Sequence, residues 1–84
     1  MMDAGSRLIS LHDLGTGEEG TVEEMHGGYG FIRRMQSMGI RPGKRIKKIS
    51  AQFFLGPVTV KVENTVIAIG HGMSRKVMVR VSGK

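Results

Sequence analysis

The chain has 84 residues, of which 39% are apolar, and this is enough for one small domain with a single core. It has no cysteine, which excludes disulfides and thiolate metal sites, and no apolar run approaches the roughly 20 residues of a membrane span. The net charge of +6 is uneven, since residues 1–30 carry one basic and six acidic side chains whereas residues 31–84 carry twelve basic and one acidic. The first residues lack the pattern of a signal peptide, so we expect a cytoplasmic protein.

The N-terminal part of the chain predicts one strand and the segments that lead to it. Residues 1–7 include small and polar side chains and are expected to form a flexible terminus. In residues 8–14, leucines spaced three apart predict an anchored lead-in segment or a short helical turn. Glycines mark residues 15–20 as a turn, and residues 21–25 are predicted to form the first strand.

Residues 29–38 predict one short amphipathic α-helix. Its apolar side chains fall at positions i, i+4 and i+7 and therefore share one face, which holds Phe31, Met35 and Met38. Gly39 can take the left-handed position just after a helix, and Pro42 prevents the helix from continuing. Residues 41–44 are then expected to form a type II turn.

The remaining segments predict strands, over residues 45–50, 58–62, 66–69 and 77–81, with a short helical turn over residues 73–76. Ile46 and Ile49 cannot share one face of a regular strand, so a bulge or bend is expected between them. About five short strands around one helix predict a mainly β fold, a small closed barrel. We expect this single domain to span residues 8–81, with a tail at residues 82–84.

The motifs that could carry chemistry argue against catalysis. Residues 15–20 match the spacing of a dinucleotide-binding glycine motif, but no predicted strand leads into them and no helix follows. No Ser, His and Asp pattern signals a nucleophile, so we expect no enzymatic activity. The histidines are scattered along the chain, and they would bind ferrous iron or zinc only if the fold gathered His12, His26 and His71. No other cofactor is expected.

Several segments together follow one known pattern: a helix ending in Met-Gly-Ile-Arg-Pro-Gly at residues 38–43, preceded by Leu-His-Asp-Leu at 11–14 and followed by the strand segments 56–62 and 66–69. This pattern resembles the FeoA family, small cytoplasmic proteins of bacterial ferrous iron transport, over about residues 8–81. The resemblance implies an SH3-like barrel without enzymatic activity. It also implies binding to the cytoplasmic, GTPase-bearing region of a FeoB-type transporter, with the membrane reached only through that partner.

The resemblance transfers no binding residues, so the site is predicted from the residues themselves. The basic side chains that face away from the helix core, or follow the helix, are candidates for contact with a partner, as are two consecutive aromatic residues: Arg33, Arg34, Arg41, Phe53 and Phe54. The two phenylalanines stand in a run of three large apolar residues that cannot all face inward from an extended chain. They are therefore predicted either to form an exposed contact or to plug the open end of the barrel.

Two questions about charge stay open at this stage. Four glutamates precede the helix: Glu18, Glu19, Glu23 and Glu24. Either they pair with Lys and Arg across neighbouring strands, or they leave a functional basic face uncovered. The alternative function is a basic barrel that binds nucleic acid, although few aromatic residues are available to stack on bases. Exposed strand edges would also allow homo-oligomers.

Overall fold

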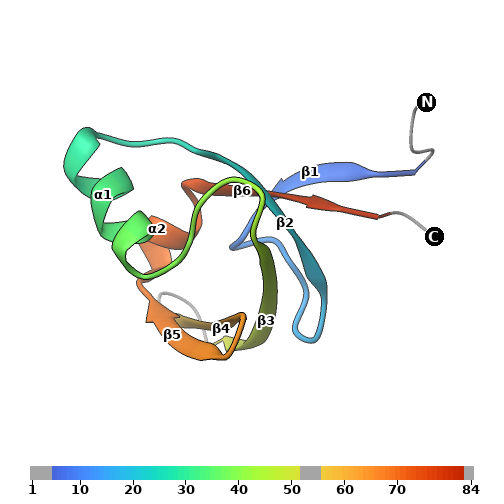
Figure 1. Ribbon diagram of the computed structural model, residues 1–84. Coiled ribbons are helices and arrows are strands. Elements are labelled where there is room, and N and C mark those ends of the chain that lie inside the picture. Colours follow the sequence, from blue (N-terminus) through green and yellow to red (C-terminus); the bar gives the residue numbers. More distant parts are fainter. Residues whose placement is uncertain (1–4, 52–55, 83–84) are drawn as a thin grey trace.

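The computed structural model describes residues 5–51 and 56–82, which form one antiparallel sheet of six strands and two short helices (Figure 1). In chain order the elements are β1 (Arg7–Ser10), β2 (Glu19–Met25), α1 (Tyr29–Ser37), β3 (Arg45–Ala51), β4 (Val58–Val62), β5 (Thr65–Ile69), α2 (His71–Ser74) and β6 (Val77–Val81). The strand order across the sheet is β1-β6-β2-β3-β4-β5. The last strand in sequence therefore lies between the first two.

The sheet confirms the mainly β prediction but has one strand more than the five expected. Residues 7–10 form a strand, β1, and not the start of a lead-in segment. Strand β1 pairs with β6, and Arg7 lies opposite Val81. The leucine spacing was misleading because it spans two elements: Leu8 lies in the strand, whereas Leu11 and Leu14 are buried in the turn that follows. That turn is a single helical one, since the N–H of Leu14 donates to the carbonyl of Ser10 at 3.1 Å.

Helix α1 and its C-terminal end confirm the local signals. Met35 is fully buried, while Arg33 and Arg34 are exposed on the other side of the helix. Gly39 has φ +90°, and its N–H and that of Ile40 donate to the carbonyls of Gln36 (3.0 Å) and Met35 (2.9 Å). This is the hydrogen-bond pattern of a Schellman motif. The following turn also forms, with the N–H of Lys44 donating to the carbonyl of Arg41 at 3.1 Å and Gly43 at φ +95°.

Strand β3 carries the expected bulge and an unexpected buried lysine. Its register against β4 shifts between Lys48 and Ser50, and Ile49 faces outward. Ile46 and Lys48 lie two residues apart and share the inner face by ordinary strand alternation, and Lys48 is only 4% exposed. Its ammonium donates a hydrogen bond to the carbonyl of His12 at 2.8 Å, so the buried charge has a polar partner.

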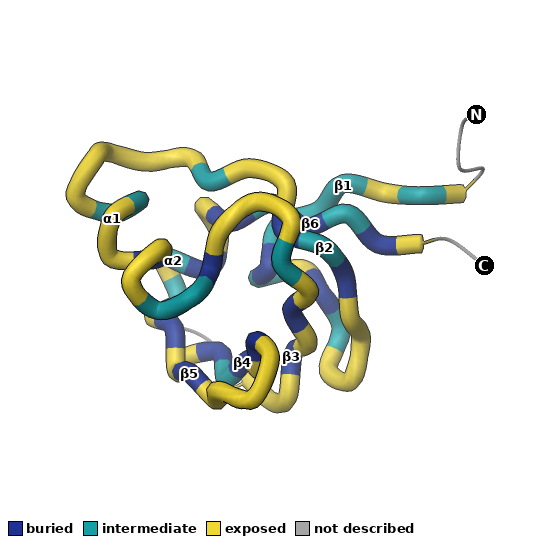
Figure 2. Tube along the Cα trace, in the orientation of Figure 1, coloured by how far each residue is buried: buried dark blue, intermediate teal, exposed yellow. Residues whose placement is uncertain are grey.

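The core lies inside the curved sheet and beneath α1, where the strands are dark in Figure 2. In β4 and β6 every second residue is buried, and together the two strands contribute Val58, Val60, Val62, Val77, Val79 and Val81. Strands β2 and β6 are packed closely. A Cβ atom added at Gly20 would contact Val79 and stand 2.6 Å from the carbonyl oxygen of Arg80. Only glycine fits at this position without a shift of the backbone.

Helix α2 spans residues 71–74 instead of the predicted 73–76. It starts directly after Gly70, whose carbonyl accepts the N–H of Ser74 at 2.9 Å. The buried Ser74 hydroxyl donates to the carbonyl of His71 at 2.7 Å, and its own carbonyl accepts the N–H of His12 at 3.1 Å. These bonds attach α2 to the turn after β1.

Candidate protein-interaction site

Charged side chains on β2 are largely matched by partners on neighbouring segments. The guanidinium of Arg80 donates to both carboxylate oxygens of Glu23 (3.0 and 3.2 Å), and Arg45 lies 3.5 Å from Glu19. The bond from Arg80 lowers the pKa of Glu23. Glu18, just before the strand, lies 3.8 Å from Arg7, whereas Glu24 contacts His26 at 2.9 Å. Three of the four glutamates therefore pair with arginines of neighbouring segments, one of the two arrangements that the sequence left open.

The cations on and beside the two helices, in contrast, lack carboxylate partners within the described residues. Neither helix nor its C-terminal flank contains an acidic residue, and the exposed cations there are Arg33, Arg34, Arg75 and Lys76. None of them takes part in an ion pair formed within residues 5–51 and 56–82. Two lie over aromatic rings: Arg33 over Tyr29 and Lys76 over Phe31, each 5.5 Å from the ring centroid. These are cation–π contacts, which hold the charges at the surface without neutralising them.

A groove of about 380 Å³ lies among these cations, between α1 and α2. We call it the helical groove, and it is lined by Gly30, Phe31, Arg34, Met73 and Lys76. Its floor is apolar, because Phe31 and Met73 are only partly buried against the core. An apolar centre with a charged rim is the arrangement of a protein-binding surface.

The structure brings together some of the predicted binding residues. Arg34 lines the helical groove, and Arg33 stands next to it on α1. Arg41 is exposed in the turn after α1, where its charge helps to lower the pKa of Glu63, and it does not line the groove. Phe53 and Phe54 lie outside the described residues. Whether any of these side chains binds a partner stays a prediction.

Sequence reasoning did not identify three groove residues. Phe31 was assigned to the core from its helical spacing, and the structure shows it shared between core and groove. Met73 and Lys76 reach the groove because α2 packs next to α1, an arrangement that no local signal encodes. Gly70 directly precedes α2, whereas Gly72 lies within it, so the two glycines around His71 did not mark the bounds of this helix.

The three histidines divide between two places. The rings of His12 and His71 meet edge to face with centroids 4.8 Å apart, and His12 also contacts Asp13 at 3.2 Å. His26 instead bonds Glu24. Within residues 5–51 and 56–82, no three His, Asp or Glu side chains are arranged to hold a metal ion.

Comparison with known proteins identifies the class and the family. In the described part of the chain, no helix is long and apolar enough to cross a membrane. A crystal structure of an iron uptake regulatory protein (FeoA) superposes with a TM-score of 0.82 at 32% identity, covering 88% of this chain and 97% of that one. A zinc complex of Stenotrophomonas maltophilia FeoA, described as an SH3 domain protein, superposes with a TM-score of 0.72 at 23% identity, covering 84% and 88%. The fold is thus an SH3-like barrel.

The sequence comparisons are equally specific. The FeoA domain matches residues 9–81. A Methanocaldococcus jannaschii protein named "Putative Fe(2+) transport protein A" is 41% identical over 63 residues, which are 75% of this chain and 74% of that protein. The chain belongs to the FeoA family, the accessory proteins of ferrous iron transport.

Proposed function

We propose that this protein is a non-catalytic cytoplasmic accessory protein that binds the GTPase-bearing cytoplasmic region of a FeoB-type ferrous iron transporter. The helical groove and the cations beside it form the contact surface, with Arg33 and Arg34 at its centre. Arg41 extends the positive charge toward the turn after α1.

One observation supports this assignment: the cations of α1 and α2 are unpaired within the described residues and border an apolar groove. Unpaired surface cations favour encounter with an acidic partner and set the rate of association, while a partly buried apolar floor gives the bound complex its affinity. Phe31 and Met73 supply that floor, and Arg34 and Lys76 supply the charge.

The test measures association between the purified full-length chain and the transporter's cytoplasmic region by biolayer interferometry. The double variant Arg33→Glu/Arg34→Glu is expected to weaken binding by at least about tenfold, mainly through slower association. Arg7→Glu, on β1 away from the groove, is the control and should change binding by less than about twofold. Both variants should melt within a few degrees of the unmodified chain.

Unchanged binding of a folded Arg33→Glu/Arg34→Glu variant would overturn this choice of surface. Absence of binding by the unmodified chain would overturn the choice of partner. The nucleic-acid alternative is tested in the same instrument with single-stranded RNA and DNA oligonucleotides. It requires binding that decreases steeply with salt, and tight binding of this kind would replace the proposal.

A further inference from the structure

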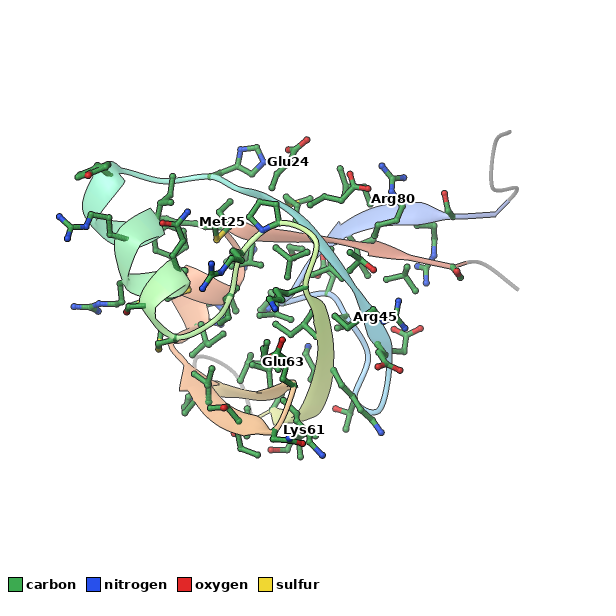
Figure 3. The ribbon with its side chains drawn as sticks, viewed as in Figure 1. Glu24, Met25, Arg45, Lys61, Glu63 and Arg80 are labelled. Atoms are coloured by element: carbon green, nitrogen blue, oxygen red, sulfur yellow. The ribbon has the colours of Figure 1, made fainter. Side chains whose placement is uncertain are left out.

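A second groove, of about 640 Å³, lies across the outer faces of β3 and β4 and reaches Glu19, the first residue of β2. We call it the strand groove. Arg45, Lys61 and Glu63, labelled in Figure 3, lie on its border, together with Lys44, Lys47 and Glu19. It shares no lining residue with the helical groove, so an inference drawn from it does not depend on the proposed function.

Half of the cations in the strand groove are already paired. Lys44 donates to Glu63 at 2.6 Å, a bond that lowers the pKa of Glu63. Arg45 lies 3.5 Å from Glu19. Among the described residues, these two glutamates are the only acidic ones that line the groove, and both of their carboxylates are engaged.

The other two cations face each other. Lys47 and Lys61 are direct register partners on β3 and β4, both exposed on the outer face. On its other side Lys47 lies opposite Glu19 of β2, whose carboxylate contacts Arg45. Like charges placed opposite each other on antiparallel strands destabilise the pair. Within the described part of the chain, neither lysine forms an ion pair. An anionic group bound between them would relieve this repulsion.

The composition of the groove favours an acidic peptide over a nucleic acid. None of the described lining residues is aromatic, so none of them can stack on a base. Glu19 and Glu63 at the border oppose a continuous run of phosphates, whereas a single carboxylate can lie between them. Ile49, which faces outward and is 40% exposed, gives an apolar contact in the same groove as the two lysines.

We propose that the strand groove binds an acidic peptide segment of a protein partner. A carboxylate of the segment lies between Lys47 and Lys61, and an apolar side chain next to it packs on Ile49.

The probe is a synthetic peptide, Gly-Ser-Asp-Glu-Leu-Glu-Asp-Ser-Gly, titrated into the ¹⁵N-labelled full chain at low salt. Saturable amide shifts are expected at Lys47, Ile49 and Lys61. The same peptide with Asn and Gln in place of its acids should give no saturation. The variant Lys47→Gln/Lys61→Gln should weaken binding by at least about tenfold. The control Arg7→Gln/Arg80→Gln removes the same charge from β1 and β6, outside both grooves, and should stay within about twofold of the unmodified chain.

Three results would overturn the proposal: no saturable binding at millimolar peptide, shifts confined to the helical groove, or equal binding by the two double variants. Tighter binding of an oligouridine than of the peptide, with shifts at the same residues, would assign the groove to nucleic acid instead. An independent readout is thermal melting. Lys61→Gln should raise the melting temperature slightly at low salt and lose this gain at 1 M salt, because the repulsion is then screened. A lower melting temperature at low salt would contradict the claim that the two lysines repel each other.

Discussion

The strand end of the molecule, formed by β1, β2 and β6, and the helical end, formed by α1 and α2, carry their charges in opposite ways. At the strand end, Glu18 and Glu23 pair with Arg7 and Arg80, so acidic and basic segments neutralise each other. At the helical end, two of the cations, Arg33 and Lys76, lie over aromatic rings, and within the described residues none of the four pairs with a carboxylate. Strand pairing therefore neutralises part of the positive charge at the strand end. The excess that makes up the net charge of +6 is concentrated on particular surfaces and is not spread evenly.

The two ends also differ in how closely they are packed, and this difference gives the largest predicted effect. Gly20→Ala places a Cβ against Val79 and the backbone of Arg80, which cannot move away without disturbing the β2–β6 pairing. We expect a loss of about 1–3 kcal/mol in the free energy of unfolding, measured by urea denaturation. The matched control is Gly30→Ala in α1, where nothing lies within 4 Å of the new Cβ.

Gly30→Ala should instead gain up to about 1 kcal/mol, because alanine is the better helix former. Equal changes in the free energy of unfolding for the two substitutions would contradict the difference in packing between the two ends.

The second prediction weakens the helical end through its C-terminal cap. Gly39→Ala forces a residue with a Cβ into φ +90°, at a cost of about 1–2 kcal/mol. Hydrogen exchange should also be faster at the amide of Ile40, which bonds the carbonyl of Met35. Gly39→Asn should recover part of the loss, since asparagine tolerates this region better. A stability equal to that of the unmodified chain for Gly39→Ala would contradict the cap.

The third prediction concerns the buried side of the sheet. Burial lowers the pKa of Lys48 from its ordinary value of 10.5, and attraction to Asp13 and Glu18 opposes this only in part. The unfolded chain thus binds the proton more tightly, and Lys48 makes stability increase as pH rises from its folded pKa toward about 10.5. Lys48→Met keeps an apolar side chain in the core but should not show this increase in stability with pH. At pH 7 its free energy of unfolding should lie within about 1 kcal/mol of that of the unmodified chain. Urea denaturation between pH 7 and 10 measures both. Parallel curves would contradict the prediction.

The smallest effect concerns the exposed pair at the strand end. The bond from Arg80 holds the pKa of Glu23 below its ordinary value, so its contribution to stability is present above pH 4.5 and is lost as pH falls through the folded pKa. In Arg80→Gln, the pKa of Glu23 should rise toward 4.5, as followed by carboxyl ¹³C NMR. Glu63, which bonds Lys44, is the internal control and should not change. An unchanged Glu23 titration would show that the pairing is weak in solution.

Local signals explain how much of the fold could be predicted. Gly39 and Pro42 fixed the end of α1, and the alternating valines of β4 fixed its buried face, because each depends on the conformation of a few neighbouring residues. Strand β1 was missed because it is defined by its pairing with β6, about 70 residues later in the chain.

The candidate site was predicted less well for the same reason. Arg33 and Arg34 could be placed on the outer face of α1 from helical spacing alone. Which cations stay unpaired depends on how side chains meet across the strands. Glu19 lies opposite Lys47 in the register but contacts Arg45, and Lys47 also lies opposite Lys61.

The pairing of β1 with β6 has a practical consequence for rearranging the chain. Because Arg7 lies opposite Val81, the start of β1 and the end of β6 lie side by side, across from α1 in Figure 1. A short linker could join them, and new termini opened at the exposed Glu63–Asn64 turn would give a circular permutant with every strand retained. In such a molecule, an affinity handle or fluorophore would sit beside the strand groove instead of at the β1–β6 end.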